Sequence, residues 1–204
     1  MTIRPDLAIV ADLVPAGARV LDLGCGDGEL LAHLAAEHGC TGLGVDVDPL
    51  ATVEAIRRGV SVIEADIDGQ LEEFADQSYD VVVLSQTLQA TMHPAAVLEH
   101  MQRIGSLCVV SVPNFGLWRN RVALARGRMP VSQSIPHAWH ETPNIHLSTL
   151  ADLEDLFARV GLVTRRRILL GEDGSPLGAG RLGERVTERL GNLRAAAAVY
   201  VLAS

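Results

Sequence analysis

The feature that most constrains the fold is a glycine-rich loop directly after a short apolar run. The run Arg19–Leu21 leads into Asp22-Leu23-Gly24-Cys25-Gly26-Asp27-Gly28, and the helix-like stretch Glu29–Leu34 follows the last glycine. Glycines permit a tight backbone turn and let a ligand lie against bare backbone. The pattern therefore predicts a strand, a ligand-binding turn and a helix.

The spacing of the glycines indicates the kind of ligand. The dinucleotide fingerprint is G-x-G-x-x-G, with a pyrophosphate at the helix N-terminus. Here the glycines stand at every second position after Asp22, which resembles the D-x-G-x-G-x-G motif of class I S-adenosylmethionine (SAM)-dependent methyltransferases. SAM carries an ammonium and a sulfonium and no phosphate, so the acids Asp22 and Asp27 suit it better than a phosphate. The alternative is a structural turn without a ligand.

Composition limits the class of protein. At 204 residues the chain is most simply a single domain, residues 1–204, and 48% hydrophobic residues supply a sizeable core. The formal net charge of -8 argues against a nucleic-acid or membrane-surface partner. Since no apolar run is long enough to span a bilayer and the N-terminus lacks a signal core, we expect a cytoplasmic protein.

The three cysteines indicate neither a disulfide framework nor a metal site. Cys25, Cys40 and Cys108 are scattered, without a C-x-x-C pair, and a reduced compartment is expected. Cys25 lies in the glycine loop, where a small side chain fits, and a catalytic thiol there is the weaker interpretation.

Short apolar runs alternate with helical patterns, which predicts a parallel α/β sheet. Strands are expected near Arg19–Leu23, Thr41–Asp46, Ser61–Ala65, Tyr79–Leu84, Leu107–Val112, Val163–Leu170 and Ala196–Leu202. Helices are expected near Gly28–His38, Pro49–Arg57, Pro94–Ile104 and Thr149–Val160. Pro49 and Pro94 suit the first turn of a helix, where a missing N–H costs little. Asp48 and Ser148 are the expected N-caps of the second and fourth helices.

Two acids that follow predicted strands are candidates for holding a nucleoside. Asp46 ends the second strand, where a carboxylate in a nucleotide-binding unit accepts hydrogen bonds from ribose hydroxyls. The alternative role, a helix cap, falls better to Asp48. Asp66 follows the third strand; in the methyltransferases it resembles, an acid here accepts from the adenine amino group and the next backbone, at Ile67, meets the ring. Asp68 is a competitor for this role, and an ordinary loop acid is the alternative.

The stretch after the fourth strand is expected to reach the same crevice, because open α/β sheets bind ligands at the carboxyl ends of their strands. Ser85 and Gln86 could therefore flank the methionyl part of the ligand. The Asp/Asn-Pro-Pro-aromatic tetrad of many N-methyltransferases is absent, which removes one substrate class. The candidate SAM-binding residues are Asp22, Gly24, Cys25, Gly26, Gly28, Asp46, Val47, Asp66, Ile67, Ser85 and Gln86.

The connection from Pro113 to Ser148 is unusually long for a compact domain. It holds both tryptophans and four arginines against one acid, Glu141, in an otherwise acidic chain. Tryptophan and arginine are enriched at interface cores. One interpretation is a docking or substrate surface, formed by Phe115, Trp118, Arg119, Arg128 and Trp139. The other is an α-hairpin insert that closes over the sheet as a lid, with its arginines solvated.

Three further features have expected roles. His146 is a weak candidate for a catalytic base, since a lone histidine is more often a structural hydrogen-bonding group. The run Arg165–Arg167 opens the sixth strand and is expected to protect a strand edge. The glycine-rich stretch from Gly171 to Gly183 is expected to be a mobile loop.

Five stretches together resemble the methionine-biosynthesis family MetW. They are Asp22–Leu31, 85–91, Pro113–Gly116, Gly127–Pro130 and 142–147, and the resemblance runs from about Arg4 to Leu170 and resumes at Asn192–Arg194. It implies a Rossmann-like class I methyltransferase fold: a seven-stranded, mostly parallel sheet with helices on both faces and an insert after the fifth strand. The last strand of that fold usually inserts antiparallel.

The resemblance also implies a partner, homoserine O-acyltransferase, and SAM or S-adenosylhomocysteine as the ligand. Two functions follow. The chain is a subunit that binds SAM or S-adenosylhomocysteine and supports or regulates the acyltransferase, or it is an active methyltransferase on an unidentified small-molecule or protein acceptor. Self-association into a homo-oligomer stays open.

Overall fold

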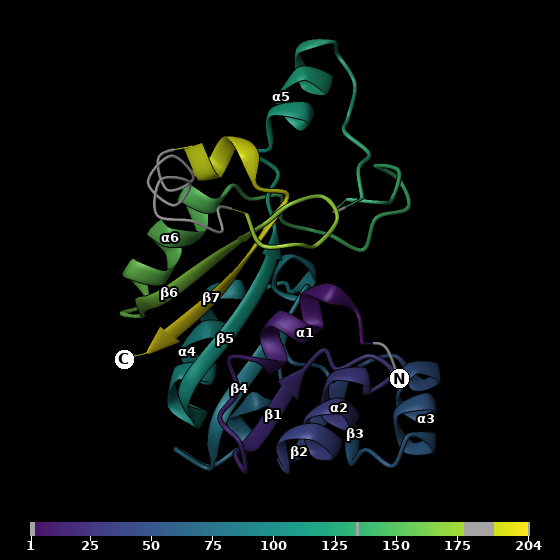
Figure 1. Cartoon of the computed structure of the whole chain (residues 1–204), viewed down its shortest axis with the longest axis vertical. Helices are drawn as coiled ribbons and strands as arrows, with labels where there is room; N and C mark the ends of the chain where they lie inside the picture. The colour runs from purple at the N-terminus through teal and green to yellow at the C-terminus, as the bar shows by residue number, and fades with distance from the viewer. Residues whose placement is uncertain (1–2, 134, 178–189, 204) are drawn as a thin grey trace.

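The computed structural model describes residues 3–133, 135–177 and 190–203, which build a seven-stranded sheet with helices on both faces (Figure 1). The strands are β1 (Arg19–Leu23), β2 (Thr41–Asp46), β3 (Val62–Glu64), β4 (Tyr79–Ser85), β5 (Gly105–Pro113), β6 (Val163–Leu170) and β7 (Ala197–Ala203). Their order is β3-β2-β1-β4-β5-β7-β6. The first five strands in this order run parallel, while β7 lies antiparallel between β5 and β6. The predicted fold class is confirmed, including the antiparallel last strand.

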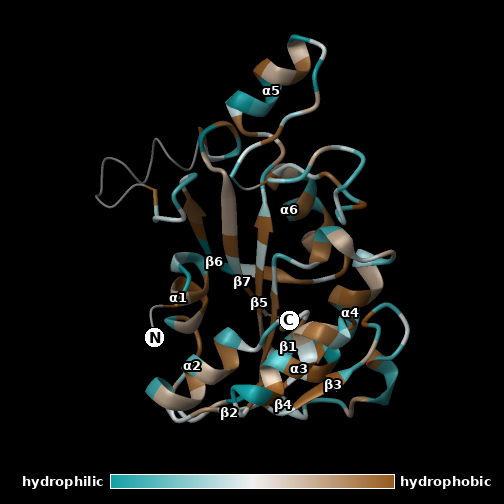
Figure 2. Cartoon of the chain, turned by 90° about the vertical axis from the view of Figure 1, so that its right-hand side faces the viewer, coloured by the Kyte–Doolittle hydropathy of each residue, from teal (hydrophilic) through white to brown (hydrophobic). Residues whose placement is uncertain are grey.

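Two helical layers cover the sheet. The helices are α1 (Pro5–Ala11), α2 (Glu29–His38), α3 (Pro49–Arg57), α4 (Pro94–Ile104), α5 (Trp118–Ala125) and α6 (Leu150–Arg159), with the 3-10 turns η1 (Leu71–Glu73) and η2 (Leu88–Ala90). Figure 2 shows α1 and α2 on one side of the sheet and α4 and α6 on the other. Each layer packs on its own hydrophobic core. Leu7, Val10 and Leu34 lie in the core beneath α1 and α2, and Leu98 and Phe157 lie in the core beneath α4 and α6. The central strands are buried on both faces, which explains the uninterrupted apolar run of β4.

Every expected strand is present, with bounds within two residues of those predicted. Asp48 caps α3 as expected, since its carboxylate accepts a hydrogen bond from the amide of Leu50 at 2.8 Å. The cap expected at Ser148 is wrong. Thr149 caps α6 instead, because its hydroxyl and backbone exchange hydrogen bonds with Asp152 in a reciprocal capping box.

Helix α1 was not expected from the sequence, and a helix at α5 was expected only if the insert was an α-hairpin. With 7 and 8 residues they are too short for a strong periodic signal. Helix α1 nevertheless shows two sequence marks of a helix: Pro5 at the first position, and an apolar spacing of Leu7, Val10 and Ala11 that matches the buried face.

The run Arg165–Arg167 lies on β6, an edge strand of the described sheet, and the register between β6 and β7 shifts between Thr164 and Arg166. Positive charge and an irregular register both discourage edge-to-edge pairing, as expected. Of the glycine-rich stretch, Gly171–Leu177 closes a turn in which the amide of Leu177 donates to the carbonyl of Leu169 at 2.7 Å. Residues 178–183 lie outside the described residues. Within the described ranges, every helix is too short or too polar to cross a bilayer.

The insert stands above the carboxyl edge of the sheet and carries α5 (Figure 1). Asn114, at its base, is fully buried and donates from Nδ2 to the carbonyls of Asn192 and Ala195 at 3.0 and 2.8 Å. Asn192 in turn accepts from the amide of Leu150. At the far end, the amides of Ile145 and His146 donate to the carbonyl of Gln89. Both ends of the insert are thus tied to the sheet.

Candidate functional site

A crevice lies where the strand order of the sheet reverses, between β1 and β4. Strands β1 and β4 are neighbours, yet β1 continues to β2 on one side and β4 to β5 on the other, and ligands of open α/β sheets bind outside the carboxyl ends at such a point. A cavity of about 250 Å³ opens here. It is lined by Gly24, Asp46, Val47, Ala65, Asp66, Ile67, Asp68, Gln86, Thr87, Ala90 and Thr91.

Two glycines of the loop have separate physical roles. Gly24 has φ 72°, and a Cβ atom built on it would lie 2.3 Å from Oγ1 of Thr87, so the approach of β1 to β4 leaves no room for a side chain. Gly26 has φ 55°, and apart from its two chain neighbours no atom of the described residues would lie within 4 Å of a Cβ atom there. Gly24 therefore allows β1 to pack closely against Thr87, while the space beside Gly26 is open.

Most amides of the loop are already used inside the protein. The amides of Gly24 and Cys25 donate to the carbonyl of Val45 at 2.7 and 3.1 Å. Gly26 donates to Oδ2 of Asp46 at 2.7 Å, and Gly28 to the carbonyl of Cys25 at 3.1 Å. Most of the loop groups left to face a ligand are therefore carbonyls and carboxylates, which suit a cation better than a phosphate.

Asp22, the acid before the glycines, is buried without full hydrogen bonding. It is 2% exposed, and among the described residues its Oδ1 has no hydrogen-bond partner. Burial, and to a lesser extent the nearby charge of Asp46, raises the pKa of Asp22 to about 7, while the positive charge of Arg4 acts in the opposite direction. A buried carboxylate with an unused oxygen needs a cation or a hydrogen-bond donor. The ammonium group of SAM or of S-adenosylhomocysteine has both properties, so the residues present fit the ligand.

We expect Asp22→Asn to stabilise the unliganded protein at about pH 8. Because the pKa of Asp22 rises from 3.8 to about 7 on folding, the folded protein retains a proton that the unfolded chain has released. Stability therefore falls as the pH rises between these two values, and asparagine removes that loss. Thermal melting should show a higher melting temperature for the variant at about pH 8 and a smaller difference near pH 5. A constant difference across this range would contradict the assignment. Asp80→Asn should instead lower the melting temperature by a similar amount at both pH values, since hydrogen bonds from Arg19 lower the pKa of Asp80 below 3.8 and so move its titration out of this range.

The acids after β2 and β3 lie together in the cavity. Asp46 accepts from the amide of Gly26 with Oδ2 and from the amide of Asp48 with Oδ1, and each oxygen keeps a second lone pair. Asp66 accepts from the amide of Asp68 at 2.9 Å. The competitor Asp68 already has both oxygens engaged, with the amides of Met92 and His93 ahead of α4. Within the described residues one hydrogen bond reaches the carboxylate of Asp66 and two reach that of Asp68, so Asp66 has the larger free acceptor capacity.

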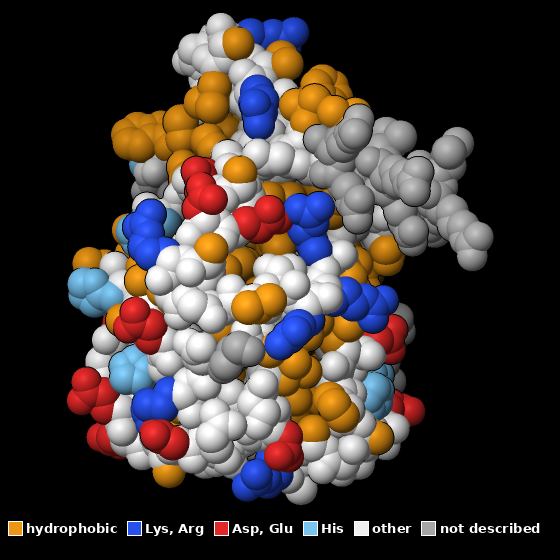
Figure 3. Space-filling view, turned by 90° about the vertical axis from the view of Figure 1, so that its left-hand side faces the viewer, with side chains coloured by type: hydrophobic (Ala, Val, Ile, Leu, Met, Phe, Trp, Pro, Cys, Tyr) orange, Lys and Arg blue, Asp and Glu red, His pale blue; other side chains and the backbone are white. Residues whose placement is uncertain are grey.

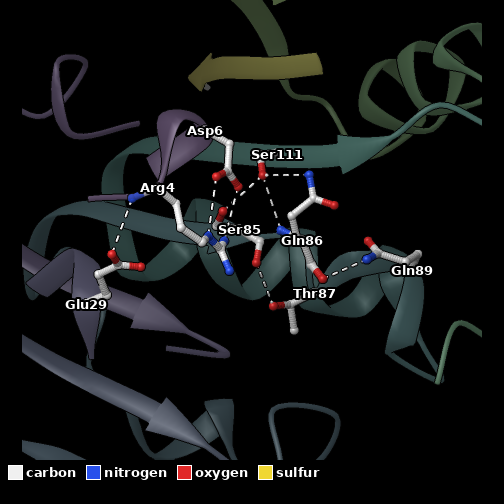
Figure 4. Close-up of polar contacts among 8 residues, drawn as sticks. All are labelled: Arg4, Asp6, Glu29, Ser85, Gln86, Thr87, Gln89 and Ser111. Atoms are coloured by element: carbon white, nitrogen blue, oxygen red, sulfur yellow. Dashed lines mark hydrogen bonds and ion pairs between the residues drawn. The ribbon is translucent and has the colours of Figure 1, made fainter. Parts of the chain in front are cut away.

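The residues after β4 are held in a strained turn (Figure 4). Gln86 has φ 56°, which is rare for a residue with a side chain. Its amide donates to the carbonyl of Ser111 at 2.9 Å, and its carbonyl accepts from the side-chain amide nitrogen Nε2 of Gln89 at 2.6 Å. The hydroxyl groups of Ser85 and Ser111 lie 3.0 Å apart. These contacts hold the backbone against its strain and fix Gln86 at the crevice.

Six of the predicted SAM-binding residues line the cavity wall, four others lie at the ends of β1 and β4, and Gly28 lies apart from them. Gly24, Asp46, Val47, Asp66, Ile67 and Gln86 line the cavity. Asp22, Cys25, Gly26 and Ser85 lie beside it in the same two strand ends. Gly28 faces Ala55 and Val60 instead, and so belongs to the packing of α3. Burial raises the pKa of the Cys25 thiol to about 12, which disfavours a nucleophilic thiolate.

His146 is not placed with these residues. It is exposed and lines a second cavity of about 340 Å³ between η2, α4 and α6, together with Gln89 and Ile145. Two residues that the sequence interpretation missed are Thr87 and Thr91, which line the first cavity. Little in the sequence indicated that these two threonines line a cavity, because a threonine after a strand belongs to no distinctive motif.

The fold and the crevice define a protein of the SAM-dependent methyltransferase fold. A solved S-adenosylmethionine-dependent methyltransferase from Mesorhizobium loti is similar over 98% of both chains, with a TM-score of 0.69 and 18% sequence identity. The chain belongs to the MetW family, because the family profile described as methionine biosynthesis protein MetW matches residues 4–202.

Two curated relatives are similar to the chain, and one of them carries the MetW name. The chain is 33% identical over 183 residues to the bifunctional methionine biosynthesis protein MetXA/MetW of Rhodopirellula baltica, covering 85% of this chain and 29% of that protein. It is also 35% identical over 88 residues to a ubiquinone biosynthesis O-methyltransferase of Pseudomonas fluorescens, covering 41% of this chain and 38% of the relative. The chain thus spans well under half the length of the curated relatives that it matches here.

Proposed function

We propose that this methionine-biosynthesis protein binds SAM or S-adenosylhomocysteine in the crevice and acts as a subunit that supports or regulates a homoserine O-acyltransferase. The observation that best supports this ligand is the buried carboxylate of Asp22, which has an oxygen without a hydrogen-bond partner among the described residues. It stands at the head of a loop whose middle glycine, Gly26, borders open space.

Each part of the ligand has a residue suited to it. Asp22 would take the ammonium group, Asp46 the two ribose hydroxyls and Asp66 the adenine amino group, with Ile67 against the ring. When bound, SAM offers a transferable methyl group, and as the product of methionine it also reports how much methionine the cell holds. The residues of this chain orient the ligand and shield it from water.

We expect Asp46→Ala to weaken the affinity for S-adenosylhomocysteine by about tenfold or more, because a hydrogen bond to a charged group contributes roughly 1.5–3 kcal/mol. Titration calorimetry on the folded variant measures this loss. Asp48→Ala is the matched control, since Asp48 caps α3 and accepts from the amide of Leu50. That variant should lose stability and keep its affinity. An unchanged affinity in Asp46→Ala would remove Asp46 from the ligand site.

The insert supports the acyltransferase as the partner. Trp118 is 49% exposed, Trp139 73% and Val131 63%, and these side chains accompany the exposed arginines Arg119 and Arg128. Figure 3 shows hydrophobic and basic side chains gathered on the lobe that carries α5. The relative from Rhodopirellula baltica joins MetXA and MetW in one chain, so a non-covalent pairing of two separate proteins is a reasonable counterpart.

An active methyltransferase is the alternative function. The ubiquinone biosynthesis O-methyltransferase relative favours it. Against it, His146 lies at the second cavity and the thiol of Cys25 has a raised pKa. Conversion of SAM to S-adenosylhomocysteine by the purified protein, with cell extract as a source of acceptors, would favour the alternative.

A further inference from the structure

The proposed ligand carries one group that the site described so far does not match. Both SAM and S-adenosylhomocysteine end in an amino acid, with a carboxylate beside the ammonium group. Backbone amides commonly bind such an anion, but the amides of Gly24, Cys25, Gly26 and Gly28 already donate to protein oxygens. A cationic side chain near Asp22 would bind this carboxylate.

Arg4 lies where that side chain is needed. Its backbone amide donates to Oε1 of Glu29, the first residue of α2 after the glycine loop, at 3.3 Å. Its positive charge acts on Asp22 strongly enough to oppose the rise in the pKa of that buried carboxyl. In Figure 4, the side chains of Arg4 and Asp6 extend to the same end of the sheet as Ser85 and Ser111.

The guanidinium of Arg4 already binds a carboxylate in this structure. Nε and Nη2 donate to the two oxygens of Asp6 at 3.3 and 3.1 Å. The side chain of Arg4 is 57% exposed, and two of its five N–H groups are used in this pair. An exposed ion pair of this kind is weak, so a second carboxylate can replace Asp6 or share the guanidinium with it.

We propose that Arg4 binds the carboxylate of the amino-acid end of the ligand while Asp22 holds its ammonium group. This inference rests on the proposed binding of SAM or S-adenosylhomocysteine. The buried acid Asp22 and the exposed Arg4 then form a pair of opposite charges that matches a zwitterion. Arginine suits this role because its planar fork binds a carboxylate with two parallel hydrogen bonds. The segment before α1 becomes a specificity element that selects ligands with an intact amino acid.

Three nucleosides test the proposal by titration calorimetry. S-adenosylhomocysteine has both charged groups, its decarboxylated form has only the ammonium group, and 5′-methylthioadenosine has neither. We expect Arg4→Gln to lose roughly tenfold or more in affinity for S-adenosylhomocysteine, and to bind the other two as the unaltered protein does. Arg4→Lys keeps the positive charge and loses the planar guanidinium. Its affinity for S-adenosylhomocysteine should lie between that of the unaltered protein and that of Arg4→Gln.

Arg19→Gln is the matched control, because Arg19 is as exposed as Arg4 and pairs with Asp80 at the opposite end of β1. It should bind all three compounds normally, and thermal melting should show all variants folded. Two results would overturn the proposal: an unchanged affinity of Arg4→Gln for S-adenosylhomocysteine, or an equal loss for all three compounds, which would make Arg4 a structural residue. If the unaltered protein binds none of the three, the proposed ligand itself is wrong, and this inference fails with it.

Discussion

Replacing Gly26 with valine should reduce the affinity for S-adenosylhomocysteine by roughly a hundredfold or more, close to the limit of detection by calorimetry. The side chain would enter the open space beside Gly26, where no protein atom lies within 4 Å and where we place the ligand. A φ of 55° also strains any residue with a Cβ atom. That strain costs about 1–2 kcal/mol of stability, which a folded domain tolerates.

Gly17→Val is the control for this strain. Gly17 has φ 73°, and a Cβ atom there would also meet nothing within 4 Å, but it lies in the turn before β1, away from the crevice. Both variants should melt at a similarly lowered temperature, and only Gly26→Val should lose the ligand. If Gly26→Val binds normally, the loop is a structural turn without a ligand.

The second large effect is expected at the insert. Trp118→Ala and Arg128→Ala should each reduce binding to the homoserine O-acyltransferase by about thirtyfold, because tryptophan and arginine at the centre of an interface contribute roughly 2 kcal/mol or more. Trp118 is 49% exposed and packs beneath the guanidinium of Arg119, 5.5 Å from its ring centre. Its removal should therefore leave the melting temperature nearly unchanged, unlike the loss of a core tryptophan. Partner capture and thermal melting on the same variants measure both quantities.

Matched controls lie on α3, far from the insert in the chain. Ile56 is 61% exposed, and Arg57 forms an exposed ion pair with Glu54, much as Arg119 pairs with Glu172. Ile56→Ala and Arg57→Ala should keep the partner. Insert variants that are stable and still capture the acyltransferase at full strength would exclude this docking surface, and would leave the insert as a lid over the crevice.

The fold was predictable because its signals are local. The alternation of apolar runs and helical patterns, with Pro49 and Pro94 at helix starts, gives the strands and four of the helices. The N-cap of α6 was misplaced by one residue, because Ser148 and Thr149 are both good caps and only the reciprocal bond to Asp152 decides between them. Short helices such as α1 depend on packing against the sheet, which a sequence window does not contain.

The position of the candidate site was predictable from the sequence, and the contacts within it were not. The glycine loop and the acids after β2 and β3 follow from the rule that ligands bind at the carboxyl ends of strands. Which of Asp66 and Asp68 is available depends on the amides ahead of α4, more than 20 residues away in the chain. The approach of Thr87 to Gly24 and the position of Arg4 near Asp22 are likewise tertiary contacts. No local spacing encodes them.

The most direct test of the account is sedimentation velocity on the purified chain mixed with the homoserine O-acyltransferase of the same organism, with S-adenosylhomocysteine present. The account predicts one heavier species that contains both proteins and the nucleoside. Two separate boundaries at micromolar concentrations, with the nucleoside bound to neither protein, would contradict it.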